Sequence, residues 1–205
     1  MKRLSPGVII LLLLVGAAAL LLGGYNRLVG LEEGVEAAWA QVENVYQRRA
    51  DLIPNLVATV KGARDFEQET LERVVNARAK ATQTVIEGIP NAEQLQAFQA
   101  SQDALSSALS RLMVVVERYP ELKATEAFRD LQRQLEGTEN RVAVERRRFN
   151  EAARAFNTAR RRFPTNLIAN WFGFEEKPYF KATEGSDKPP TVDFGGVSPA
   201  VDFSN

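Results

Sequence analysis

The sequence predicts an all-α protein: a single N-terminal transmembrane helix, an antiparallel up-down bundle of four long helices, and a disordered C-terminal tail. Three observations support this fold class. Residues 8–22 form a run of apolar or small side chains without a charge. Apolar residues then recur at alternating spacings of three and four, the period of one face of a helix. Glycine and proline are rare between residues 34 and 164, where good helix formers such as Ala, Glu, Arg, Gln and Leu are abundant.

The first element is a membrane anchor, expected at residues 1–25. A helix from Gly7 to Tyr25 would be about 27 Å long, close to the hydrocarbon thickness of a bilayer, so we expect residues 7–25 to lie in the membrane. A cleaved secretory signal peptide is an alternative, because Ala17-Ala18-Ala19 is similar to a cleavage site, although residues 20–22 continue the apolar run. A buried core helix is a second alternative, but no face of this segment is polar.

Charges on either side of the anchor predict its orientation. Lys2 and Arg3 precede the apolar run, whereas Arg27 is the one basic residue among the twenty that follow Tyr25. By the positive-inside rule, we expect a single-pass membrane protein with a cytoplasmic N-terminus and its body outside.

Residues 26–180 are expected to form the helical bundle, and residues 181–205 the tail. Lys, Pro, Gly, Ser and Asp are frequent in the tail, a composition typical of disorder. The chain has 26 basic and 26 acidic residues, and because Lys2 and Arg3 belong to the anchor, the body has a net charge of −2. This balance does not indicate a nucleic-acid binder, so we expect no nucleic acid among the partners.

The first bundle helix is predicted from about Leu28 to Lys61, as a continuation of the transmembrane helix. Pro54 is expected to kink it, because proline removes a backbone hydrogen bond. Its seam, the row of residues expected to face the core, is Val35, Trp39, Val42, Tyr46, Arg49, Ile53, Leu56 and Val60.

The second helix follows a turn near residues 62–65 and is expected to end at Gly88 and Pro90. Its predicted seam is Leu71, Val75, Arg78, Thr82, Val85 and Ile89. The third helix begins after Asn91, because Asn91 with Gln94 three residues later is a capping-box pattern, and it ends at Tyr119-Pro120. Its predicted seam is Leu95, Phe98, Leu105, Leu109, Leu112 and Val116.

Thr125 is the expected N-cap of the fourth helix, which Pro164 ends. Its predicted seam is Phe128, Leu131, Leu135, Thr138, Val142, Glu145, Phe149, Ala152, Phe156, Ala159 and Phe163. Four long helices joined by short connections pack as an up-down bundle, here with a left-handed, coiled-coil-like core.

Several motifs, in order along the chain, resemble those of one protein family. Residues 48–57 read Arg-Arg-Ala-Asp-Leu-Ile-Pro-Asn-Leu-Val, residues 119–124 read Tyr-Pro-Glu-Leu-Lys-Ala, and residues 135–141 read Leu-Glu-Gly-Thr-Glu-Asn-Arg. Phe149-Asn150 and Phe156-Asn157 stand where the family usually has Tyr-Asn pairs. Further matches are Leu131-Gln132, Phe163-Pro164 and Gly173-Phe174. From about Tyr25 to Phe180, the chain resembles the LemA family.

The resemblance implies an N-terminal membrane anchor on an antiparallel helical bundle, in agreement with the residue pattern. It implies no particular biochemical activity. Phenylalanine in place of tyrosine at Phe149 and Phe156 removes two hydroxyl groups of the family pattern.

The chain contains no histidine and no cysteine. The commonest general base and metal ligand, and every thiol nucleophile, are therefore missing. A di-iron bundle, which needs histidine, and a glycine-rich phosphate loop are also excluded. We predict no catalytic residue, no cofactor and no metal site, and a protein that is not an enzyme. An enzyme that works with carboxylates alone remains the alternative.

Arg49, Arg78 and Glu145 interrupt the apolar seams. Because the first and fourth helices run beside each other, we expect a buried ion pair between Arg49 and Glu145, shared with Arg78, that fixes the register of the helices. The alternative is that these side chains reach solvent from the edge of the seam.

Arginines and aromatic residues gather where the fourth helix returns toward the membrane. We expect Arg160, Arg161, Arg162, Trp171, Phe172 and Phe174 to contact the bilayer surface or a membrane partner. Alternatively, the arginines complement the helix dipole and the aromatic side chains cover the end of the bundle.

These observations favour a non-enzymatic, membrane-anchored helical scaffold that binds a protein partner, of unidentified type, at the cell envelope. The alternatives are a carboxylate-dependent envelope enzyme and a membrane-surface binder that uses the arginines of the fourth helix.

Overall fold

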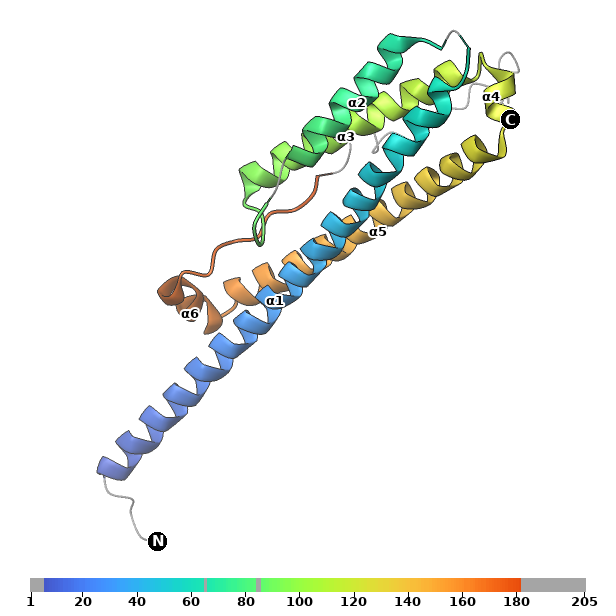
Figure 1. The fold of residues 1–205 in the computed structure, drawn as a ribbon. Helices are drawn as coiled ribbons and strands as arrows, with labels where there is room; N and C mark the ends of the chain where they lie inside the picture. The colour runs from blue at the N-terminus through green and yellow to red at the C-terminus, as the bar shows by residue number, and fades with distance from the viewer. Residues whose placement is uncertain (1–5, 65, 84–85, 182–205) are drawn as a thin grey trace, which may run out of the picture.

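The computed structural model describes residues 6–64, 66–83 and 86–181, and regular structure in these residues is entirely helical. The helices are α1 (Pro6–Lys61), α2 (Gln68–Gln83), α3 (Ala92–Val116), α4 (Pro120–Ala124), α5 (Glu126–Arg161) and α6 (Thr165–Phe172), shown in Figure 1. The predicted all-α fold class is confirmed. Beyond Lys181, the predicted disordered tail lies outside the described residues.

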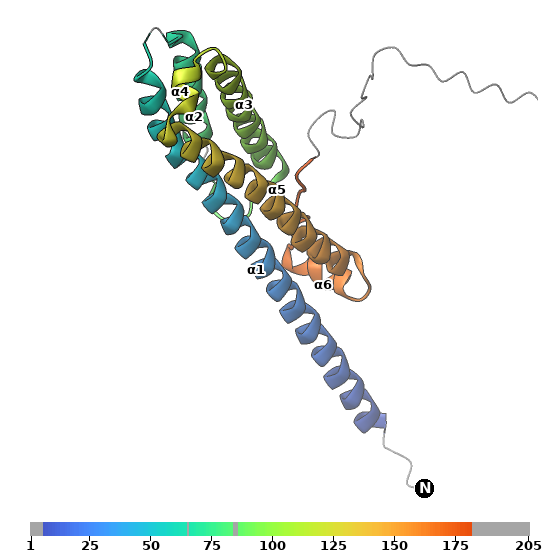
Figure 2. The ribbon, with the colours of Figure 1, turned by 90° about the vertical axis from the view of Figure 1, so that its right-hand side faces the viewer.

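Helix α1 is one unbroken helix of 56 residues, which would be about 84 Å long. It joins the apolar segment to the bundle, as predicted, and continues through Pro54. Its N-terminal part extends beyond the other helices (Figure 2), and the described side chains from Gly7 to Leu22 are exposed. Among the described residues, this helix, over Ile10–Lys61, is the one long and apolar enough to cross a membrane, with a mean hydropathy of 1.7.

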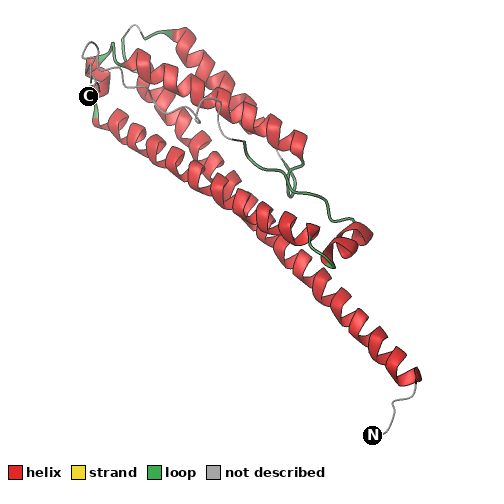
Figure 3. Cartoon of the chain, turned by 180° about the vertical axis from the view of Figure 1, so that it is seen from behind, coloured by secondary structure: helices red, strands yellow, loops and turns green. Residues whose placement is uncertain are grey.

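The bundle is antiparallel and up-down (Figures 1 and 3). Helices α1 and α5 pack along their shared length, and α2 and α3 form a hairpin that packs on them. The short helix α4 turns the chain from α3 into α5 at the end farthest from the N-terminus. Helix α6 contacts α1 and α5 where α1 leaves the bundle.

Two buried apolar clusters form the core. The cluster nearer the anchor is rich in aromatic side chains, including Trp39, Phe98 and Phe149. The cluster farther from it is mostly aliphatic, with Leu56 and Leu105 among its members. Along α1 the first cluster ends at Tyr46 and the second begins at Ile53, so Arg49 lies between them.

The predicted helix starts are confirmed at two caps. Asn91 and Gln94 form a reciprocal capping box, with the Asn91 side chain accepting from the Gln94 backbone at 2.8 Å. The Thr125 hydroxyl accepts from the backbone N–H of Phe128 at 3.3 Å. Both side chains satisfy N–H groups that the first turn of a helix leaves without a backbone acceptor.

The structure corrects the second predicted helix. Helix α2 ends at Gln83, not at Gly88, and its buried residues include Val74 and Ala81, whereas Val75 is 46% exposed. From Leu71 the sequence allows two three-four seams one residue apart, and periodicity alone does not choose between them. Packing against both α1 and α3 selects the seam through Val74.

Helices α4 to α6 differ from the prediction in two further ways. Helix α5 ends at Arg161, so Phe163 leaves the seam and is 80% exposed. Helices α4 and α6 were not predicted from the sequence, because five and eight residues are too short for a periodic pattern. Gly173 ends α6 with a φ of +74°, a left-handed conformation that favours glycine.

The corrected seam of α2 is tested by placing one carboxylate at two neighbouring positions. We expect Val74→Asp to lower the free energy of unfolding by more than about 3 kcal/mol, because the charge would be buried, and Val75→Asp to change it by less than about 1 kcal/mol. Denaturant unfolding of the intact protein in mild detergent measures both. Equal effects of the two substitutions would contradict this register.

Candidate functional site

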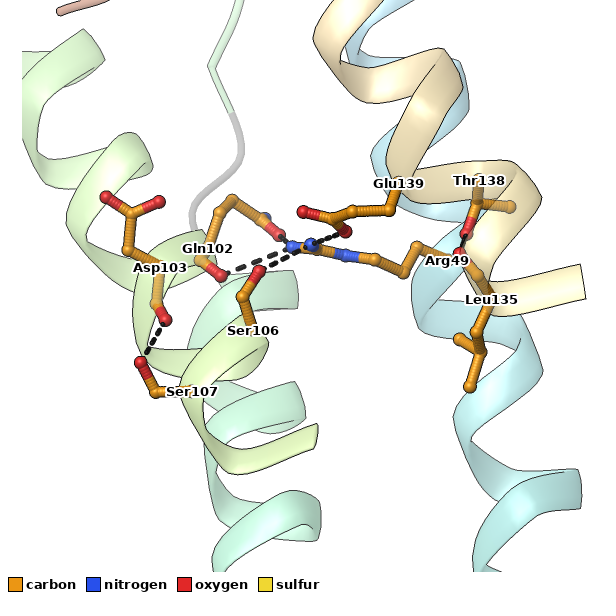
Figure 4. Close-up of polar contacts among 8 residues, drawn as sticks. All are labelled: Arg49, Gln102, Asp103, Ser106, Ser107, Leu135, Thr138 and Glu139. Atoms are coloured by element: carbon orange, nitrogen blue, oxygen red, sulfur yellow. Dashed lines mark hydrogen bonds and ion pairs between the residues drawn. The ribbon is translucent and has the colours of Figure 1, made fainter. Parts of the chain in front are cut away.

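A polar cluster around Arg49 occupies the layer between the two apolar clusters. The Arg49 side chain is 1% exposed and extends from α1 toward α3 (Figure 4). Its Nη1 donates to Ser106 Oγ at 2.8 Å and to Glu139 Oε2 at 2.9 Å. Its Nη2 donates to Gln102 Oε1 at 2.6 Å and to the Gln102 carbonyl at 3.3 Å. One guanidinium therefore connects α1, α3 and α5.

Helix α2 joins the same layer through two side-chain-to-backbone bonds. Gln102 Nε2 donates to the Ala81 carbonyl at 3.2 Å, and Arg78 Nε donates to the Ala50 carbonyl at 2.8 Å. The Tyr46 ring lies 5.0 Å from the Arg49 guanidinium carbon and covers it from the side of the aromatic cluster. All four long helices are thus connected at one height of the bundle.

The predicted buried arginine is present, but its predicted partner is wrong. Arg49 pairs with Glu139, whereas Glu145 accepts from Arg148 at 2.9 Å, and Arg78 bonds to backbone. Seam-based reasoning missed Glu139 because this side chain is 58% exposed and lies off the seam. Gln102 was recognisable, since it falls between Phe98 and Leu105 at the three-four spacing of the α3 seam.

The environment of the cluster suppresses ionisation of Tyr46. Desolvation by burial raises the pKa of its hydroxyl above the ordinary value of 10.0, while Arg146 and Arg49 act in the opposite direction. Tyr46 is therefore a neutral aromatic group at physiological pH. Within the described ranges, no group of three or more acidic side chains is placed to hold a metal ion.

The end of the bundle nearest the anchor is formed by α6 and by Tyr25 of α1. The Phe172 and Phe174 rings lie 4.9 Å and 5.7 Å from the Tyr25 ring. An added Cβ at Gly24 would lie 2.3 Å from Cδ1 of Ile168, so glycine permits the close approach of α6. These contacts place α6 at the end of the apolar segment.

The structure brings the six predicted interface residues to this end, but not all face outward. Arg161, Arg162, Trp171 and Phe172 are exposed, and Trp171 is 82% exposed. Arg160 instead donates from Nε to the Phe174 carbonyl at 2.7 Å, and Phe174 is partly buried. Phe163 and Leu167 add exposed apolar surface beside them.

A groove between α1 and α5 lies next to this end. It has a volume of about 380 Å³ and is lined by Arg27, Arg154 and Arg162, with Glu151 as the acidic residue among its lining. Its charge is predominantly positive, close to the level at which α1 would leave the bilayer.

Two asparagines of α5 were missed as functional residues by sequence reasoning. Asn150 and Asn157 hold the backbone of the segment that follows α6. The signal was the repeat of Phe-Asn at residues 149–150 and 156–157, because a spacing of seven puts both asparagines on one helix face.

Comparison with known proteins gives one family and several relatives. The model of the LemA family matches residues 38–194. The chain is 28% identical over 200 residues to the magnetosome proteins MamQ 1 and MamQ 2 of Paramagnetospirillum magneticum, an alignment that covers 89% of this chain and 74% of each relative. It is 23% identical over 163 residues to protein LemA of Metamycoplasma hominis, covering 80% of this chain and 71% of that protein.

A double-mutant cycle tests the partner of Arg49. Arg49→Ala is expected to lower the free energy of unfolding by about 3–5 kcal/mol, because it leaves a cavity and unpaired buried groups. Glu139→Gln is expected to cost about 1 kcal/mol, because the carboxylate is half-exposed. Denaturant unfolding in mild detergent should give a coupling of at least about 0.5 kcal/mol for Arg49 with Glu139. The matched cycle with Glu145→Gln should give none, and the opposite ranking would contradict the observed pair.

Proposed function

The chain belongs to the LemA family, and we propose that it acts as a membrane-anchored scaffold that binds protein partners at the cell envelope without catalysing a reaction. Family membership and the apolar N-terminal helix make it a membrane-associated helical protein. The partner-binding role is our inference from the architecture.

The continuity of α1 is the observation that carries this proposal. One helix runs from the apolar segment to Lys61 at the far end of the bundle. From Tyr25 to Lys61 it rises about 54 Å, so the far end is held at a fixed distance from the bilayer. A rod that is rigidly joined to its anchor suits the display of a binding surface.

The chemistry of the polar groups is consistent with this role. The chain has no histidine or cysteine, and Arg49 with its partners is used to connect helices. An envelope enzyme that depends on carboxylates is the competing proposal. It would require acidic groups that converge on a bound substrate.

The membrane-proximal end favours a second function, docking on the bilayer surface. Trp171, Phe172 and Leu167 expose apolar surface on a helix that packs at the end of the apolar segment. Tryptophan is typical of the membrane interface, and the arginine-lined groove beside α6 suits phosphate headgroups. In this proposal α6 lies at the headgroup level and fixes the tilt of the bundle.

We infer that the N-terminus is cytoplasmic and that the bundle lies outside, from the charge asymmetry around the anchor. Because the chain has no cysteine, one introduced at the exposed Ala104 is a unique label. An impermeant maleimide added to intact cells should label Ala104→Cys. Labelling only after lysis would show the opposite orientation, with the bundle in the cytoplasm.

Affinity capture tests the scaffold proposal. The intact tagged protein, cross-linked in membranes and solubilised in mild detergent, is expected to retain a protein partner at a defined stoichiometry. The Val75→Asp variant controls for nonspecific capture by an exposed apolar residue and should retain the same partner. Recovery of a small ligand together with turnover, and no protein partner, would favour the enzyme instead.

Tryptophan quenching tests docking by α6. The chain has two tryptophans, the buried Trp39 and the exposed Trp171. In nanodiscs that contain brominated lipid, we expect emission of the wild-type protein to be quenched, and that of Trp171→Phe to be quenched much less. Equal quenching of the two proteins would show that Trp171 does not reach the lipid.

A further inference from the structure

The chain segment after α6 runs back along α5 without forming a helix or a strand (Figure 2). It extends from Phe174 to Lys181 and lies against α5 and α1. Its carbonyl and N–H groups have no neighbouring strand to pair with in the described residues, and side chains of the bundle bind several of them.

Two asparagines bind this segment in the same way. Asn157 Nδ2 donates to the Lys177 carbonyl at 2.8 Å, and the Lys177 N–H donates to Asn157 Oδ1 at 2.9 Å. Asn150 Nδ2 donates to the Phe180 carbonyl at 3.1 Å, and the Phe180 N–H donates to Asn150 Oδ1 at 2.9 Å. Each amide therefore pairs with both backbone groups of one residue, and Asn157 Nδ2 also donates to the Tyr179 hydroxyl at 2.9 Å.

The spacing of the asparagines matches an extended peptide. Seven residues of helix rise about 10.5 Å, and three residues of extended chain span about 10 Å, so Asn157 and Asn150 meet Lys177 and Phe180 in register. Two arginines of α5 bind carbonyls on either side: Arg160 binds that of Phe174 at 2.7 Å, and Arg146 that of Lys181 at 2.9 Å.

Two side chains of the segment enter selective sites. Phe180 is 6% exposed, and the centroid of its ring lies 5.5 Å from that of the Phe149 ring and 6.2 Å from that of the Trp39 ring. The Lys177 Nζ lies 2.5 Å from Glu32 Oε1 and 5.1 Å from the centre of the Phe156 ring. A basic site and an aromatic site are thus separated by three residues of extended chain.

We propose that this face of α5 is a recognition site for an extended peptide that carries lysine and, three residues later, an aromatic residue. The occupant we infer is a segment of a partner protein, and residues 174–181 are the chain's own copy of that ligand. This inference rests on the proposed partner-binding function and names the chemistry of the partner. Exchange is feasible because the asparagine bonds to the backbone do not depend on sequence and the side chains that enter the two sites are those of Lys177 and Phe180.

Two later Val-Asp-Phe segments of the sequence also contain a phenylalanine but do not satisfy this pattern. Val192-Asp193-Phe194 and Val201-Asp202-Phe203 have Thr191 and Ala200 three residues before the aromatic residue. Neither supplies a cation for Glu32, which distinguishes them from residues 177–180.

Peptide titration tests the site in the full-length protein in nanodiscs. The probe is a fluorescent, end-capped peptide with the sequence of residues 174–181. The Phe180→Ala protein, which weakens the tethered segment, should bind it saturably. The wild-type protein should bind it at least about tenfold more weakly, because a tethered competitor acts at an effective concentration of about 1 mM. A peptide with alanine at the Phe180 position should lose binding to Phe180→Ala by at least about tenfold.

A matched pair of glutamate variants tests the basic site. In the Phe180→Ala background, Glu32→Gln should abolish the preference for lysine over methionine at the Lys177 position of the peptide. Glu33→Gln, at the exposed neighbouring residue, should leave that preference unchanged. Equal preference in both variants would overturn the assignment of Glu32.

Absence of saturable binding to a Phe180→Ala protein with normal helix content would overturn the site. If Phe180→Ala loses helix content, the wild-type protein is titrated with peptide up to millimolar concentration instead. Saturable binding would then support the site, and the absence of saturation would overturn it. Capture of a partner by the wild-type protein without peptide binding would refute this site and leave the scaffold proposal standing. Peptide binding without partner capture would support this site and refute the scaffold proposal.

Discussion

The buried guanidinium of Arg49 is the constraint on which the bundle depends. An ionised side chain in an apolar core is costly unless hydrogen bonds and an opposite charge compensate for lost solvation. Ser106, Gln102 and Glu139 provide that compensation from two other helices. Because these partners meet Arg49 at one relative placement of the helices, we propose that the charge selects one register among those that apolar seams would accept.

The position of this polar layer explains how the anchor controls the rest of the molecule. On its membrane side, aromatic side chains of α1, α3 and α5 form a cluster that also receives Phe180. That cluster is continuous with the contacts of Tyr25 and α6, so the end of the apolar segment and the segment after α6 share one packed unit. A partner that displaced Phe180 would therefore act on the same core that holds α6 at the end of the apolar segment.

Much of the fold is local, and the sequence was sufficient for those parts. The caps at Asn91 and Thr125 and the long seams of α1 and α5 depend on residues within a few turns of one another. The burial of Arg49 was predictable from its place on the seam. Its partner Glu139 was not, because a half-exposed residue off the seam leaves no periodic signal. The roles of Asn150 and Asn157 depend on where the chain runs after Pro164, which no local pattern determines.

The most direct test of this account measures whether Arg49 fixes the placement of α3 against α5. With no native cysteine, spin labels at Ala104→Cys and Asn140→Cys, both exposed, report the distance between these helices. Double electron–electron resonance spectroscopy in nanodiscs should give one narrow distance distribution with Arg49 present. It should give a broad or split distribution in Arg49→Met, which keeps the apolar stem without the charge. An equally narrow, unshifted distribution in Arg49→Met would contradict the central role of the guanidinium.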